Sequence, residues 1–285
     1  RKMTIMTTTF IPCGAKLPII ALVAGAFFGN AWWVGPSAYF VGIAAIVCSG
    51  IILKKSRLFA GDPAPFVMEL PAYHMPTLSN VLRSMWERGW SFIKKAGTVI
   101  LLSTIVIWFT STYGIVDGSF TAVEDLNQSF MAVIGQSFAW IFAPLGFGDW
   151  KAAVASINGL VAKENLVSTF GVLFGFAEVA EDGAEYWDLL RSSMSLAAGY
   201  SFLVFNLLCA PCFAAIGAIK REMNNHKWTW FAIGYQCGFA YLVGLMINQF
   251  GNAFIGLIAA LAALALIVYM LVRPYKEATK LSAKV

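Results

Sequence analysis

The chain alternates long apolar runs with short polar or charged segments, and the runs have the length of membrane-crossing helices. A helix needs about 20 apolar residues to cross the hydrocarbon core of a bilayer. Runs of this kind occupy residues 3–31, 36–53, 96–112, 192–219, 228–247 and 251–272. The pattern predicts an all-α fold, a polytopic helical membrane protein held in the lipid bilayer.

The charges of the loops orient these runs. Segment 54–95 contains seven Lys and Arg against three acids, and basic residues also flank the loop at 220–227 and fill the C-terminal tail. Cytoplasmic loops carry an excess of Lys and Arg, so these regions, and with them the C-terminus, are predicted to be cytoplasmic. Residues 113–150 hold four acids and no Lys or Arg, and residues 178–191 hold five acids and one Arg. Both of these segments are predicted to be external.

The apolar stretch at 152–176 then begins and ends outside, so it cannot cross the membrane once. It also carries Lys163-Glu164-Asn165 in its middle. Two interpretations stay open: a re-entrant hairpin, or a pair formed with residues 128–147, which are apolar but interrupted by polar residues and Pro144.

Segment 54–95 is long enough to form a region of its own between spans. Residues 60–71 are proline-rich and predicted to be extended. The following residues are amphipathic, with one apolar helical face, opposite Arg83, Glu87 and Arg88, made by Leu78, Val81, Leu82, Met85, Trp86 and Trp90. A helix at the membrane surface and a cytoplasmic helix packed on the bundle both fit this pattern.

Composition supports a membrane protein, because 59% of the residues are hydrophobic and only 12% are charged, against about 25% charged in soluble domains. No alternation of basic and aromatic residues indicates nucleic-acid binding. The chain starts with Arg1 and not with Met, which we interpret as the C-terminal piece of a longer protein. The five cysteines all lie in apolar segments, unlike a secreted disulfide framework.

Two Pro-Cys dipeptides, Pro12-Cys13 and Pro211-Cys212, lie inside span-length apolar runs, and Pro18 follows the first. Proline breaks a helix and frees backbone carbonyls, and in lipid this is tolerated only where they face protein, water or a ligand. The loop charges direct the two broken helices oppositely, with thiols at similar depth. Such inverted, broken helices are typical of secondary transporters, so the pattern predicts a path for a divalent transition metal.

Cys209 precedes Cys212 in a C-x-x-C spacing. On a helix both sulfurs would share one face and could contact one ion. The alternative is a membrane thiol-disulfide oxidoreductase that uses this pair. Metal passage is favoured because no βαβ unit is evident and the motif lies in an apolar run.

Ionisable residues within apolar stretches are expensive and commonly face a cavity or a partner. Glu164 is therefore predicted to be an oxygen ligand or gate, with Asn165 adding a carbonyl, unless Lys163 and Glu164 simply form a charge pair at a hairpin tip. Lys16 has three open roles: to repel cations, to pair with Glu164, or to reach the cytoplasmic interface. The two histidines fall in predicted loops. No phosphate-binding loop is present, so the chain is predicted to be a transporter domain and not an enzyme.

The motifs resemble one family, in register over nearly the whole chain. They are PCGAKLP at 12–18, ELPAYHMP at 69–76, PLGFGDW at 144–150, GLVAKEN at 159–165 and CAPC at 209–212. Together they closely resemble the membrane domain of FeoB, the prokaryotic ferrous iron transporter family. A nucleoside-type organic-solute carrier on the same scaffold remains a further alternative.

The resemblance implies transport of Fe²⁺ across the bacterial cytoplasmic membrane, with Fe²⁺ as substrate and no permanently bound cofactor. It also implies an N-terminal G domain that binds GTP and Mg²⁺ outside this chain, FeoA/FeoC-type accessory proteins, and an open question of homo-oligomerisation. By position, Cys13 and Cys212 match the cysteines of two Gate repeats. The expected organisation is the end of the first Gate repeat and a span (1–53), a cytoplasmic segment (54–95), a span and external segment (96–150), the second Gate repeat (151–220), and two spans with a tail (221–285).

Overall fold

The structure, a computed structural model, describes residues 2–56, 59, 77–116, 119–123, 128–161, 163–176, 180, 182–251 and 255–272. The predicted proline-rich stretch at 60–71 and the basic C-terminal tail lie outside the described residues. The regular secondary structure of the described part is helical, apart from one two-stranded antiparallel sheet in which Tyr113 pairs with Ala122 and Val116 with Ser119. The all-α class predicted from the sequence is confirmed.

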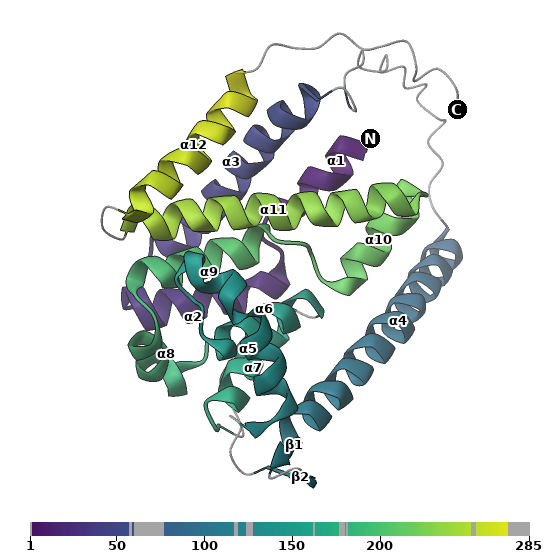
Figure 1. Ribbon diagram of the computed structural model, residues 1–285. Coiled ribbons are helices and arrows are strands. Elements are labelled where there is room, and N and C mark those ends of the chain that lie inside the picture. Colours follow the sequence, from purple (N-terminus) through teal and green to yellow (C-terminus); the bar gives the residue numbers. More distant parts are fainter. Residues whose placement is uncertain are drawn as a thin grey trace.

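The elements follow one another along the chain from the N-terminal to the C-terminal side (Figure 1). They are α1 (Lys2–Thr7), η1 (Thr8–Phe10), η2 (Gly14–Lys16), α2 (Leu17–Phe28), α3 (Val34–Lys54), α4 (Leu78–Thr112), β1 (Tyr113–Val116), β2 (Ser119–Ala122), α5 (Phe130–Phe142), η4 (Ala143–Leu145), α6 (Trp150–Val161), α7 (Asn165–Leu173), η5 (Ala184–Tyr186), α8 (Trp187–Ser193), α9 (Leu196–Leu208), α10 (Phe213–Met223), α11 (His226–Gly251) and α12 (Ile255–Val272).

Within the described residues, three helical stretches are long and apolar enough to cross a membrane: Lys2–Phe28, which includes the first break, Val34–Lys54 and His226–Phe250. They confirm the predicted spans at 3–31, 36–53 and 228–247. The run at 192–219 is divided at Pro211 into α9 and α10, so the break predicted there is confirmed. In the run at 251–272, the described residues 255–272 form the shorter helix α12.

Helices α2 and α9 form the centre of the molecule and run in opposite directions. Arg191, just before α9, donates from Nε to the carbonyl oxygen of Ala26 near the end of α2, at 2.7 Å. At the other end, Nζ of Lys16 reaches the carbonyl oxygen of Leu207 near the end of α9, at 2.7 Å. The opposite directions predicted for the two broken helices are therefore confirmed.

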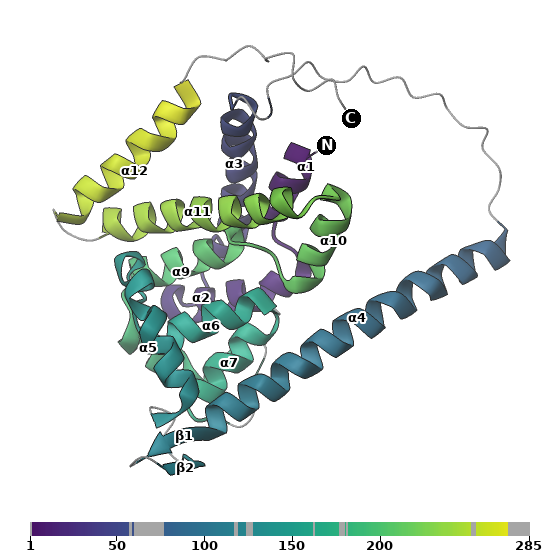
Figure 2. The same ribbon diagram turned by 45° about the vertical axis from the view of Figure 1, so that its right-hand side comes forward.

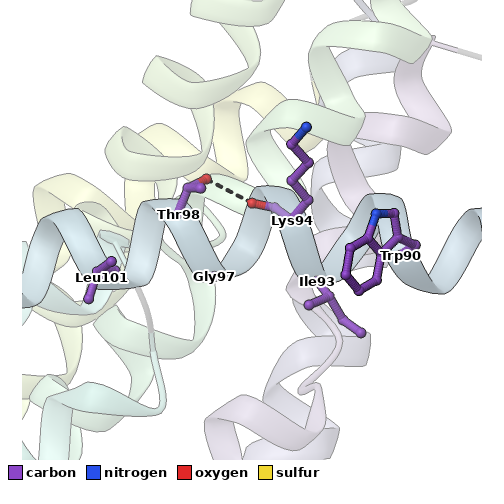
Figure 3. A pocket seen from close by; sticks show the side chains of 6 residues that line it. All are labelled: Trp90, Ile93, Lys94, Gly97, Thr98 and Leu101. Atoms are coloured by element: carbon purple, nitrogen blue, oxygen red, sulfur yellow. Dashed lines mark hydrogen bonds between the residues drawn. The ribbon is translucent and has the colours of Figure 1, made fainter.

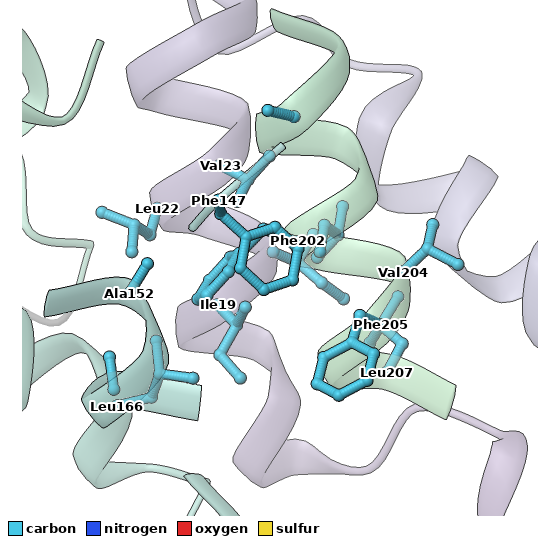
Figure 4. Packing of buried hydrophobic residues seen from close by; sticks show 14 of the residues in the cluster. Ile19, Leu22, Val23, Phe147, Ala152, Leu166, Phe202, Val204, Phe205 and Leu207 are labelled. Carbon is cyan, nitrogen blue, oxygen red and sulfur yellow. The ribbon is translucent and has the colours of Figure 1, made fainter. Parts of the chain in front are cut away.

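The core around α2 and α9 is apolar on almost every side. Helix α2 is hydrophobic all round its surface, as expected of a helix surrounded by other helices. Figure 4 shows Ile19, Leu22 and Val23 of α2 near Phe202 of α9 and Phe147 of the η4–α6 connection. On a further side of α9, Oγ of Ser201 donates to the carbonyl oxygen of Gly244 in α11, at 2.7 Å.

The segment that the sequence left open folds as a helical hairpin with a helix leading into it. Helix α5 with η4 meets α6 at a bend of 95°, and α6 turns back into α7 at Lys163 and Glu164. An Asn158–Thr169 hydrogen bond ties the two arms of the hairpin together. The Tyr186 hydroxyl donates to the carbonyl oxygen of Val167 at 2.8 Å, and burial raises the pKa of this phenol.

Helix α4 stands apart from the helical body for most of its length (Figures 1 and 2). The sequence predicts an amphipathic helix near 78–90 and a separate span at 96–112, but the structure joins them in one helix of 35 residues. A shallow groove on α4 is lined by Trp90, Ile93, Lys94, Gly97, Thr98 and Leu101 (Figure 3). All six belong to this single helix, so the groove is a helix face and is separate from the two breaks.

Candidate cation path at the two helix breaks

The first break lies between η1 and η2. Proline lacks a backbone N–H and restricts the residue before it to extended conformations. Accordingly, Ile11, before Pro12, is extended at φ −66° and ψ 133°, and Cys13 at φ −99° and ψ 170°. Pro18 was expected to be a further break, but it occupies the first turn of α2, where proline is tolerated. Pro12 ends a helix, whereas Pro18 helps to begin one.

The second break lies around Pro211, just after the end of α9. Cys209 has ψ 171° and Cys212 has ψ 161°, so the segment between α9 and α10 is extended. The expectation that both sulfurs share one helical face is therefore wrong, because α9 ends at Leu208 and α10 begins at Phe213, so the whole C-x-x-C motif lies between the two helices. All cysteines of the described part are free thiols. The geometry gives no support to a Cys209–Cys212 redox pair.

The carbonyls freed at both breaks are bound by one ammonium group. Nζ of Lys16 donates to the carbonyl oxygens of Thr9 at 3.0 Å, Ile11 at 3.5 Å and Leu207 at 2.7 Å. The residue is 2% exposed. The C-terminal end of a helix carries partial negative charge, which favours a nearby cation. Lys16 therefore links two such ends, that of η1 and that of α9. The buried Lys16 therefore neither pairs with Glu164 nor reaches the cytoplasmic interface, whereas its role in repelling cations stays a prediction.

A second buried ammonium group lies beside it. Lys163, at the tip of the α6–α7 hairpin, donates from Nζ to the carbonyl oxygen of Asn206 at 2.6 Å and to Sγ of Cys209 at 3.2 Å. Both Lys163 and Cys209 are 2% exposed. Lys163, Cys13, Cys209 and Cys212 all lie near the ammonium group of Lys16.

The other predicted site residues surround this centre without forming a closed ligand set. Cys13 and Glu164 are exposed, and Cys212 and Asn165 are partly buried. Lys163 is buried against α9, whereas Glu164 is exposed. Lys163 therefore does not form the charge pair with Glu164 that was one of the two interpretations of the hairpin tip. Within the described ranges, no three His, Cys, Asp or Glu side chains lie close enough together to hold a metal ion.

Sequence reasoning missed two residues of α11 that lie at the breaks. Nε2 of Gln236 donates to the carbonyl oxygen of Met6 at 2.9 Å and to Oγ1 of Thr9 at 2.8 Å. Its Oε1 is buried and has no hydrogen-bond partner in the described part of the chain. Cys237 lies against the backbone of Ala210 and near Cys209. The sequence could have pointed to Gln236, because it is a polar amide inside an apolar run. It held no comparable sign that Cys237 lies at a break.

The fold and this centre define a class: a polytopic helical membrane protein in which two antiparallel broken helices meet at buried polar groups. Two family models match the sequence, "Ferrous iron transport protein B C terminus" over residues 36–88 and the Gate model, "Nucleoside recognition", over residues 93–225. The chain belongs to the FeoB family and corresponds to its C-terminal membrane region.

Curated relatives match almost the whole chain. The Fe(2+) transporter FeoB of Methanocaldococcus jannaschii is 35% identical over 257 residues, which is 88% of this chain and 37% of that protein. The Fe(2+) transporter FeoB of Staphylococcus aureus strain COL is 33% identical over 90% of this chain and 37% of that protein. A fusion of Fe(2+) transport protein A with FeoB from Porphyromonas gingivalis is 33% identical over 89% of this chain and 35% of that protein.

The chain thus spans little more than a third of the length of these relatives. No solved structure matches it.

Proposed function

We propose that this chain is the membrane domain through which Fe²⁺ crosses the bacterial cytoplasmic membrane. The observation that supports the proposal most directly is geometric: the carbonyl ends of two oppositely directed broken helices converge on Lys16, and Cys13, Cys209 and Cys212 lie near this point. Converging half-helix ends coordinate cations in secondary transporters. Thiol and carbonyl ligands together suit a borderline divalent transition metal.

The proposed path enters from the acidic external face and uses the residues that the sequence singled out. Glu164 and Asn165 are exposed or partly exposed at the hairpin tip and receive the ion first. Cys209, Cys212 and Cys13 then pass it across the two breaks to the cytoplasm. Pro12 and Pro211 serve the path by keeping the backbone open at these points.

The energy for transport comes, in this proposal, from GTP hydrolysis by a G domain of the full-length protein. The family resemblance supports it, and the chain covers only a little over a third of its relatives. A FeoA-type accessory protein is a proposed partner, supported by the fusion found in Porphyromonas gingivalis. The C-terminus is proposed to be cytoplasmic because of its basic residues.

The test is Fe²⁺ uptake by cells that carry the full-length protein with Cys13→Ser or Cys212→Ser. Replacing a soft thiol with a hydroxyl weakens an iron contact, so uptake should fall about tenfold or more, equivalent to ~1.4 kcal/mol. Cys48→Ser is the matched control, because this partly buried thiol packs against the core. Wild-type uptake in both variants, at equal protein levels, would contradict the proposed path.

A further inference from the structure

The place where freed carbonyls could receive a cation already holds cationic side chains. Lys16 and Lys163 are each 2% exposed, and both direct their ammonium groups at carbonyl oxygens of the last turn of α9. A buried ammonium group needs partners of this kind because water is excluded. The two lysines therefore satisfy the same oxygens that a transported ion would use.

The two lysines are held differently. Lys16 binds three carbonyl oxygens that belong to both broken helices, so it fastens the breaks to each other. Lys163 binds one carbonyl oxygen and the thiol of Cys209, and it extends from the turn between α6 and α7. Lys163 thus has fewer contacts and comes from a hairpin tip, whereas Lys16 lies between two core helices.

Charge makes the position of Lys163 incompatible with a metal ion at Cys209. Like charges a few ångströms apart repel strongly where water is excluded. A divalent cation bound to Sγ of Cys209 and to the carbonyl oxygen of Asn206 would take both acceptors of Lys163. The ammonium group and the ion must therefore occupy this position in turn.

We propose that Lys163 is a tethered cation that occupies the Cys209 position and is displaced by the transported ion. In the conformation described here the ammonium group closes the path at Cys209, and it withdraws with the hairpin tip when a divalent cation binds. This inference deepens the proposed function and rests on it. Lys163 is a positioning and selectivity residue for the ion, and it forms no bond to it.

The test is a titration of purified full-length protein with Co²⁺, a divalent probe that, unlike Fe²⁺, is stable in air. Thiolate-to-Co²⁺ charge-transfer absorption reports binding at cysteine. Lys163→Met keeps the length of the side chain but removes its charge, so half-saturation should need at least about tenfold less Co²⁺ than in wild type. Lys163→Arg keeps the charge and should stay near wild type.

Two controls separate this effect from others. Lys163→Met combined with Cys209→Ser should lose the gained absorption, which assigns the signal to Cys209. Lys151→Met removes another lysine of the same region, one that lies over the Phe174 ring at 4.6 Å, and should leave half-saturation unchanged. A lysine that merely caps α9 predicts the opposite sign, because its loss would loosen the site and weaken Co²⁺ binding.

Each outcome decides one proposal. Equal or weaker Co²⁺ binding in Lys163→Met than in wild type, with the absorption present in wild type, overturns displacement of Lys163 and leaves the iron path intact. If neither wild type nor Lys163→Met shows thiolate absorption, displacement at Cys209 is overturned. Wild-type Fe²⁺ uptake in the cysteine variants overturns the path itself. Should Lys163→Met fail to fold, Lys163→Gln in the same titration gives the same comparison.

Discussion

At the scale of single residues, Lys16 holds the two breaks together, and its removal has a calculable cost. Lys16→Met takes an ammonium group away from buried carbonyls on both helices. Hydrogen bonds to charged groups contribute about 1.5–3 kcal/mol each, and buried acceptors left unpaired add to the loss. We expect unfolding to become easier by about 3 kcal/mol or more, measured by thermal unfolding of the full-length protein in detergent.

The matched control is Lys151→Met, which loses cation–π contacts with Phe174 and Trp150, each worth about 0.5–1 kcal/mol. Equal destabilisation by the two changes would show that Lys16 does not join the breaks. The sequence could not reveal this role, because the strongest acceptor of Lys16, Leu207, lies 191 residues away. Local spacing located Pro12, Cys13 and the break but gave no information on what fills it.

At the scale of elements, the crossing of α2 and α9 depends on a glycine. A Cβ at Gly199 would lie 2.6 Å from Cδ2 of Phe27, closer than non-bonded carbon atoms approach one another. Overpacking of this kind costs about 1–3 kcal/mol. Gly199→Ala should therefore lower the stability of the full-length protein by this amount in a thermal unfolding assay.

Gly217→Ala in α10 is the control, because a Cβ there meets nothing within 4 Å. Alanine is favoured over glycine in helices by up to about 1 kcal/mol, so this change should be neutral or stabilising. Similar losses for both substitutions would mean that the α2–α9 crossing is not tightly packed.

Apolar runs and prolines predicted most elements because both act within one or two helical turns. The spans at 36–53 and 228–247 and the break at Pro211 were recovered in this way. The same local signals failed for α4, where a polar face near 83–88 continues into an apolar run without a helix breaker. The turn at Lys163 and Glu164 was predicted only as a hairpin tip, and its inward lysine follows from packing against α9.

At the scale of the whole molecule, α4 determines how the protein meets the bilayer. At 1.5 Å per residue its 35 residues extend about 52 Å, whereas the hydrocarbon core measures about 30 Å. Trp86 and Trp90 stack in its first half beside an exposed Arg83–Glu87 ion pair. Its second half exposes Leu101, Leu102, Ile105 and Val106. We therefore expect the first half at the headgroups and the second half in lipid.

Spin labels at Cys substituted for Arg83 and Leu102, in a full-length background without other cysteines, test this placement in vesicles. Lipid-soluble oxygen should broaden the signal at position 102 more than a water-soluble nickel complex does, and the order should reverse at position 83. Ala153→Cys, at a fully buried position, should be protected from both reagents. An apolar face of this size does not remain in water, so either lipid or protein must cover it. If position 102 is protected from both reagents like position 153, protein and not lipid covers this half of α4, and the proposed placement is wrong.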